Sequence, residues 1–191
     1  MTYKVGFVYI FLHLLSLTLF SQNLEEQKVF KQQIENLSRD NSLPSDFRKA
    51  CYHFSERNWE STLVLTDKII DSDISESLRD YCYYFRGASF FNKGIYKEAL
   101  KSFYQVSDKF EFDLIVSVVK GEIFLEQRIF DSAVFYFRKA ETSVHLPQAR
   151  DIEMSMVHHN LGISYMHLGQ YVSAEKYLRK SIEAQESNVD T

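Results

Sequence analysis

The chain has 191 residues, of which 45% are hydrophobic, 25% charged and 15% aromatic, with only six Gly and two Pro. This composition excludes collagen-like, mucin-like and small disulfide-rich proteins, and it suffices to bury one substantial core. The net charge is −4 and no basic run exceeds two residues, which excludes nucleic acid as an expected partner because phosphate binding needs a concentrated basic face.

Residues 1–21 have the pattern of a secretory signal peptide. Lys4 precedes an almost wholly apolar run from Val5 to Phe20, which the small residue Ser21 follows. A helix over this run is about 24 Å long, shorter than the hydrocarbon core of ~30 Å, so cleavage after Ser21 is favoured over a stable membrane span. The end of the segment resembles export signals of the Bacteroidota. We expect a periplasmic or secreted protein, or a membrane-tethered one if the signal is not cleaved.

An N-terminal capping helix is expected within residues 22–42. Phe30, Ile34 and Leu37 form one apolar stripe on a helix from about residue 25 to 37, which can cover the open end of a helical stack. The two cysteines, Cys51 and Cys82, leave two interpretations open: a disulfide, which export permits, or two small buried apolar residues.

A repeated pattern dominates residues 43–186. Each of three copies begins with a Gly and has an aromatic residue three and nine places later, Ala twelve places later and a large apolar residue sixteen places later. The copies are Gly87, Phe90, Tyr96, Ala99 and Phe103; Gly121, Phe124, Phe130, Ala133 and Phe137, with Ala140 beyond; and Gly162, Tyr165, Tyr171, Ala174 and Leu178. A weaker copy begins at Ala50. Small residues let two helices cross closely and the aromatic residues fill the space beside them.

The distance of 34 residues from Gly87 to Gly121 closely resembles the tetratricopeptide repeat family, whose unit is a helix, a turn and a second helix. The resemblance implies an all-α fold, a right-handed α-solenoid of antiparallel helix pairs. Four repeats are expected over about 43–76, 80–112, 114–146 and 147–186, followed by a frayed tail at 187–191. The family's Pro near the end of each repeat is absent from every copy.

Some residues also indicate where helices begin and end. Gly94 and Gly169 are placed to end helices in a left-handed conformation, and Asp73 with Glu76 has the spacing of a capping box. Gly162 follows Gly121 after 41 residues, seven more than the 34-residue period, which is an excess of about two helical turns. We therefore expect one long helix from about Pro147 to Leu168, unbroken near Met154.

Sequence motifs for chemistry are missing. The chain has no Gly-rich phosphate loop, no G-x-S-x-G and no H-E-x-x-H. His158, His159 and His167 share one expected helix, but their spacings do not suit a metal ion. We therefore expect no enzyme, no cofactor and no metal.

The resemblance implies that the first helix of each repeat lines a concave, mostly apolar groove. The groove residues that it assigns are Phe47, Phe54, Tyr81, Tyr84, Phe91, Asn92, Ile115, Val118, Leu125, Met156, His159 and Met166. These positions do not match the clamp of Lys, Arg and Asn with which some members of the family grip a free carboxyl terminus. An exposed apolar surface of this kind calls for something to cover it.

The expected function is a protein-interaction module that binds a peptide or helix of a partner, anchored on Tyr81, Tyr84 and Phe91. A self-associating structural solenoid, covered by a second copy or by its own C-terminal tail, is the alternative. A free-standing relative of the sensor part of larger signalling proteins is a further one.

Overall fold

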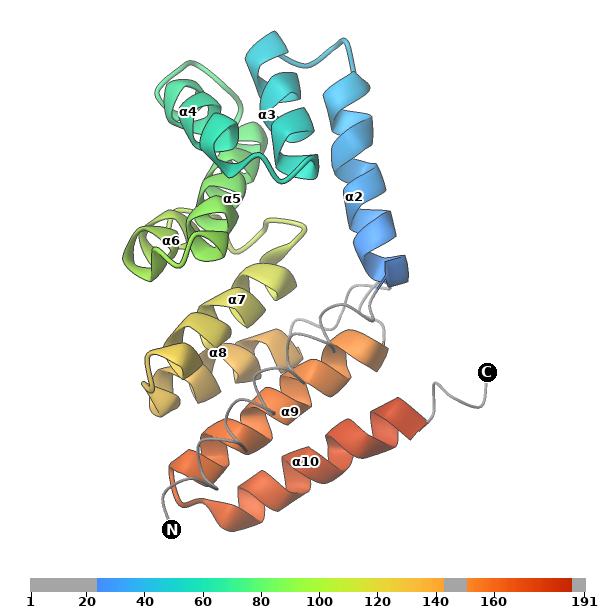
Figure 1. Cartoon of the computed structure of the whole chain (residues 1–191), viewed down its shortest axis with the longest axis vertical. Helices are drawn as coiled ribbons and strands as arrows, with labels where there is room; N and C mark the ends of the chain where they lie inside the picture. Colours follow the sequence, from blue (N-terminus) through green and yellow to red (C-terminus); the bar gives the residue numbers. More distant parts are fainter. Residues whose placement is uncertain (1–23, 143–150, 187–191) are drawn as a thin grey trace.

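The computed structural model describes residues 24–142 and 151–186, and every regular element in these two ranges is an α-helix. The helices, in chain order, are α2 (Leu24–Arg39), α3 (Ser45–Ser55), α4 (Trp59–Ile70), α5 (Glu76–Asn92), α6 (Tyr96–Phe103), α7 (Asp113–Glu126), α8 (Phe130–Thr142), α9 (Asp151–His167) and α10 (Tyr171–Glu186), as labelled in Figure 1. None of the helices in this part of the chain is long and apolar enough to cross a membrane.

The helices from α3 onward pack in consecutive pairs, α3 with α4, α5 with α6, α7 with α8 and α9 with α10 (Figure 1). Further contacts join α3 to α5 and α7 to α9, the first helices of the first two pairs and of the last two, and α6 contacts α7 between the second and third pairs. Such a stack, in which each pair contacts only its neighbours, is an α-solenoid. The predicted fold class is confirmed.

The two helices of a pair meet at the Gly of the repeat. A Cβ atom at Gly87 would lie 2.7 Å from the ring of Phe103, and one at Gly121 would lie 2.7 Å from the ring of Phe137. In the last pair Leu178 takes the place of the ring, 2.6 Å from a Cβ atom at Gly162. The large residue sixteen places after each Gly therefore fills the space that the missing side chain leaves.

The core of the stack consists of two clusters of buried side chains. The first extends from Ile34 on α2 to Ile123 on α7, and the second extends from Leu114 on α7 to Tyr177 on α10. Because α7 contributes to both, it connects the two halves of the molecule.

The turn within each pair contains a residue with positive φ. Gly94 (φ 73°) and Gly169 (φ 72°) hold this place in the second and fourth pairs, as predicted. The equivalent residues of the first and third pairs are Arg57 (φ 57°) and Arg128 (φ 61°), which the sequence pattern did not indicate.

The start of α5 differs from the capping box expected at Asp73 and Glu76. The helix begins at Glu76, and Ser75 is its N-cap, whose hydroxyl accepts a hydrogen bond from the backbone N–H of Leu78 at 3.3 Å. Ser75 has the extended backbone of an N-cap (φ −63°, ψ 153°), and its short side chain reaches that N–H from one residue before the helix. The predicted box is therefore wrong by two residues.

The other predicted helices agree with the structure where they can be compared. The helix expected over residues 25–37 is α2, and the one expected to run unbroken through Met154 is α9, which ends one residue before Leu168. The expected start at Pro147, the signal peptide at 1–21 and the tail at 187–191 lie outside the described residues. The exact limits of the four repeats stay a prediction.

Tyr171 departs from its expected packing role. Its counterpart Tyr96 lies against Phe91, with ring centroids 6.0 Å apart, and its counterpart Phe130 stacks on His167 of α9 at 4.4 Å. The side chain of Tyr171, by contrast, is 71% exposed. Phe130 is covered by the first helix of the next pair, and no further pair follows α10 within the described residues.

Candidate functional site

The expected partner-binding residues of the N-terminal half are buried. Phe47 is fully buried, and Phe54, Tyr81 and Tyr84 expose 9%, 5% and 5% of their surface. Phe47 and Phe54 pack against Phe85 of α5, with ring centroids 6.4 and 4.4 Å apart. These four residues form core contacts, so the hypothesis that Tyr81 and Tyr84 anchor a partner is corrected.

The connection between α6 and α7 covers the two tyrosines. Phe110 lies 5.1 Å from the ring of Tyr81 and 5.7 Å from that of Tyr84, and Phe112 lies at 5.9 and 6.1 Å. Both phenylalanines are buried. The covering segment therefore comes from this chain, from a connection in which the repeat pattern assigned no role to either aromatic residue.

Helix α2 also contributes to the cover of this half. Ile34 is fully buried in the same core cluster as Tyr81, and the side chain of Gln33 donates a hydrogen bond to Glu111 at 2.9 Å. Tyr81 donates a hydrogen bond to the same carboxylate, and burial, followed by the bond to Glu111, raises the pKa of the Tyr81 phenol. In Figure 1, α2 passes beside α3 toward the α6–α7 connection.

The expected residues of the C-terminal half are more accessible. Asn92 and Met166 are exposed, whereas Phe91, Ile115, Leu125, Met156 and His159 are half-buried; Val118 alone among them is buried, at 7% exposure. One place of the repeat, four residues after the Gly, carries an apolar residue in three successive first helices: Phe91, Leu125 and Met166. Figure 1 shows these helices, α5, α7 and α9, one after another in the stack. We call the accessible residues at this end of the three helices the open face: Phe91, Asn92, Glu122, Leu125, Glu126, Ile163 and Met166.

The centre of the open face is acidic. Glu122 is half-buried and Glu126, one turn further along α7, is exposed. Burial, and then the negative charge of Glu126, raise the pKa of Glu122 to about 7. Burial, followed by the negative charges of Glu126 and Glu122, also raises the pKa of Tyr96.

His159, a predicted groove residue, and the two cysteines are titratable side chains that the sequence singled out. Burial lowers the pKa of His159, so its neutral form is favoured. Cys51 and Cys82 are free thiols and fully buried; burial raises the pKa of Cys82 to about 12 and raises that of Cys51 as well. A reactive thiol needs a lowered pKa and access to solvent, so both act as small apolar core residues.

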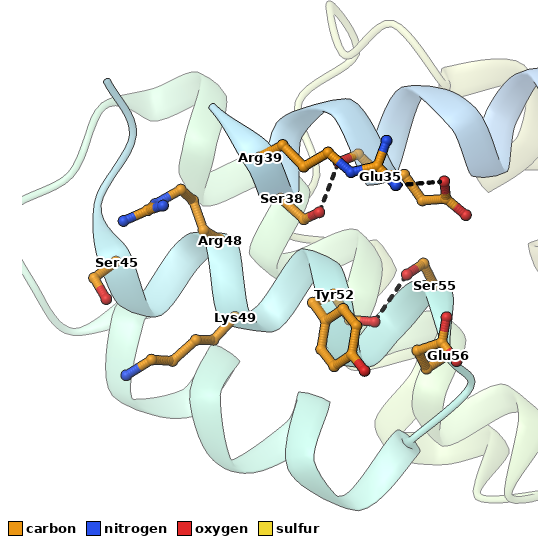
Figure 2. A pocket seen from close by; sticks show the side chains of 9 residues that line it. All are labelled: Glu35, Ser38, Arg39, Ser45, Arg48, Lys49, Tyr52, Ser55 and Glu56. Carbon is orange, nitrogen blue, oxygen red and sulfur yellow. Dashed lines mark hydrogen bonds and ion pairs between the residues drawn. The ribbon is translucent and has the colours of Figure 1, made fainter. Parts of the chain in front are cut away.

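A cavity of about 490 Å³ lies between α2 and α3 (Figure 2). Its lining is polar and of mixed charge, and comprises Glu35, Ser38, Arg39, Ser45, Arg48, Lys49, Tyr52, Ser55 and Glu56. Arg39 donates to Glu35 at 3.4 Å, and Arg48 donates to Asn41 at 2.7 Å. No sequence pattern singled out these residues, because they are ordinary polar residues of two helix surfaces. In residues 24–142 and 151–186, no group of three or more His, Cys, Asp or Glu side chains could hold a metal ion.

Comparison with protein families finds one match. Residues 155–188 match the tetratricopeptide repeat family, a range that begins in α9 and contains α10. The sequence matches no curated protein. The solenoid therefore contains a tetratricopeptide repeat in its last helix pair, and such a repeat indicates a protein–protein interaction module.

Proposed function

We propose that the chain is an exported, non-enzymatic interaction module that binds a peptide or helix of a partner protein on the open face. The observation that carries the proposal is the placement of Phe91, Leu125 and Met166. They repeat at one place of three neighbouring first helices and are only half-buried or exposed, whereas the aromatic residues of the N-terminal half are covered. Apolar side chains at regular spacing suit the apolar stripe of a helix or an extended segment.

Export is part of this proposal and rests on the sequence of residues 1–21. It fixes where the partner is sought, in the periplasm or outside the cell. It also makes the partner a protein that shares this compartment.

Photo-crosslinking in the native host tests the interaction. A photoreactive amino acid is placed at Asn92 or at Met166 on the open face, and at the exposed Lys101 of α6 as the control. Capture of the same distinct protein from both open-face positions, and not from Lys101, is expected.

Three other results contradict the proposal. Capture of this chain alone from the open-face positions favours the self-associating structural solenoid. Equal capture at Lys101, or no capture at any position, leaves the open face without a binding role.

A further inference from the structure

The exposed side of α10 carries large apolar side chains. Tyr171, Val172 and Ile182 are 71%, 86% and 54% exposed. Figure 1 shows α10 as the last helix of the stack, with α9 beside it. The terminal elements of repeat proteins usually present a polar outer face, which keeps the protein soluble. The apolar side chains of α10 therefore mark a candidate contact surface.

The third helix pair shows what covers this side of a second helix inside the stack. The fourth Gly follows the third after 41 residues, so Tyr171 and Ile182 of α10 correspond to Phe130 and Glu141 of α8. Phe130 stacks on a histidine of α9, with ring centroids 4.4 Å apart, and Glu141 forms a hydrogen bond with another at 3.2 Å. The equivalent side chains of α10 are exposed instead, and the carboxylate has been replaced by an apolar residue.

Four exposed residues form one stripe along this side of α10: Val172, Glu175, Arg179 and Ile182. They are three, four and three residues apart, the spacing at which the side chains of a helix line up toward a packed partner helix. The stripe has an apolar residue at each end. Between them, Glu175 and Arg179 form an ion pair at 2.8 Å.

From this pattern we propose that α10 is the contact surface of a homodimer, in which the α10 helices of two copies pack antiparallel about a two-fold axis. With the axis midway between Glu175 and Arg179, Val172 of one copy meets Ile182 of the other. Glu175 meets Arg179 of the second copy, and each contact occurs twice because of the symmetry. Tyr171, next to Val172, extends the apolar contact. This surface lies outside the open face, and the inference does not depend on the proposed function.

Charge complementarity favours a second copy as the occupant. The order of the stripe, apolar, acidic, basic and apolar, is its own complement when the helix is turned end to end. An antiparallel copy therefore places opposite charges together between two apolar contacts, whereas a parallel copy would place like charges together. The spacing of the stripe also reads the same in both directions, so all four contacts form in a single register.

The contact is expected to be reversible. Helix α10 has 16 residues and is about 24 Å long, so two such helices form a contact at the lower end of the size range of specific interfaces. Monomer and dimer should therefore exchange in an equilibrium that depends on concentration.

Analytical ultracentrifugation of the purified chain, over about a hundredfold range of concentration, measures this equilibrium. The variants are Glu175→Arg, Arg179→Glu and the combination of both. The matched control is Lys101→Glu, which removes an ion pair with Glu98 at 4.0 Å on α6. The three substituted side chains are exposed, so the variants should keep the fold, which far-UV circular dichroism checks.

We expect the unmodified chain and Lys101→Glu to dimerise with equal affinity. Each single reversal on α10 weakens dimerisation about tenfold or more, because like charges then meet twice across the contact. The combined variant dimerises again, since the two charges are exchanged in both copies. An equal mixture of Glu175→Arg and Arg179→Glu forms a mixed dimer, because each chain supplies the charge that the other lacks, an effect that no change within one chain can produce.

Other results overturn the inference. A chain that stays monomeric over the whole concentration range excludes the dimer. A dimer that neither single reversal weakens uses another surface, and if Met166→Asp dissociates it, that surface is the open face. Association beyond the dimer would indicate head-to-tail contacts and exclude the two-fold arrangement.

Discussion

Four equivalent turn residues, Arg57, Gly94, Arg128 and Gly169, adopt a left-handed backbone, each seven places after the small residue of the preceding helix. Gly tolerates this conformation, whereas a residue with a Cβ atom pays about 1–2 kcal/mol for it. The two arginines are exposed. The repeat therefore imposes a backbone strain in two of its four turns.

Replacing Arg128 by Gly is expected to raise the free energy of unfolding by about 0.5–1 kcal/mol. The relief of strain exceeds the entropy that Gly adds to the unfolded chain. Urea unfolding measures the difference. The control is Gly94→Ala, whose new Cβ atom would meet nothing within 4 Å, and which is expected to lose about 1 kcal/mol through the backbone alone. A loss of stability in Arg128→Gly would contradict this account.

A second residue-scale prediction concerns Gly121, where a Cβ atom would lie 2.7 Å from the fully buried ring of Phe137. Gly121→Ala is expected to lower the free energy of unfolding by about 1–3 kcal/mol, because the ring has to move in a packed core. Urea unfolding of Gly121→Ala, Phe137→Leu and the double variant checks this. The double variant should lose less than the sum of the single losses, and strict additivity would exclude direct contact as the cause.

For single residues, the packing predicted from the sequence agrees with the structure where one position of the repeat requires a particular kind of residue. The spacing of sixteen residues predicted that Phe103, Phe137 and Leu178 belong to the packing pattern, and each lies against its Gly. The strain at Arg128 could not be predicted in the same way. Its conformation follows from the turn that joins two packed helices, and Arg itself carries no signal for positive φ.

At the scale of helices, the third pair differs from the fourth in having a buried cation, Lys120, next to its Gly. Lys120 is 7% exposed, and its ammonium lies 4.6 Å from the ring centre of Tyr104 and 5.6 Å from that of Tyr136. The equivalent residue of the fourth pair, also next to the Gly, is the fully buried Leu161. Burial, and then the charge of Lys139, lower the pKa of Lys120 to about 8 from an ordinary value of 10.5.

Lys120→Met is expected to raise the free energy of unfolding by about 1–2 kcal/mol at pH 7, because an apolar side chain of similar length avoids the cost of a buried charge. The folded pKa lies below the unfolded one, so folding disfavours the charged form and this cost is fully present below pH 8. It disappears as the pH rises from about 8 to about 10.5. Urea unfolding at pH 7 and pH 9.5 should therefore show a large difference that narrows. The exposed Lys101→Met serves as the control, and a difference that widens with pH would contradict the prediction.

The sequence predicted those features of the helix architecture that recur in each repeat. The periodic pattern located the helix pairs, and the positions of Gly94 and Gly169 located two of the turns. It did not reveal that Phe110 and Phe112 bury Tyr81 and Tyr84, because both phenylalanines lie in a non-repeating connection. The family pattern assigns a side chain to a helix surface, but only the tertiary structure shows what covers that surface.

For the whole molecule, the two core clusters imply that stability is not uniform along the stack. The N-terminal cluster includes Ile34 of α2, whereas none of the α2 residues whose side chains the structure describes belongs to the C-terminal cluster, from Leu114 to Tyr177. Each helix pair contacts mainly its neighbours, so a disturbance at one end weakens as it passes along a solenoid. The open face lies on α5, α7 and α9, away from α2 in the chain.

The variant Ile34→Asp tests whether the two core clusters differ in stability. It places a charge at a fully buried position and should release α2 from the stack. We expect faster cleavage by trypsin at Arg39 and faster hydrogen exchange in α3, while amides of α9 and α10 keep their protection. The control is Gln32→Asp, at an exposed position of the same helix, which should leave both readouts unchanged. Equal loss of protection from α3 to α10 would show instead that the stack unfolds as one unit, with α2 required for the open face to form.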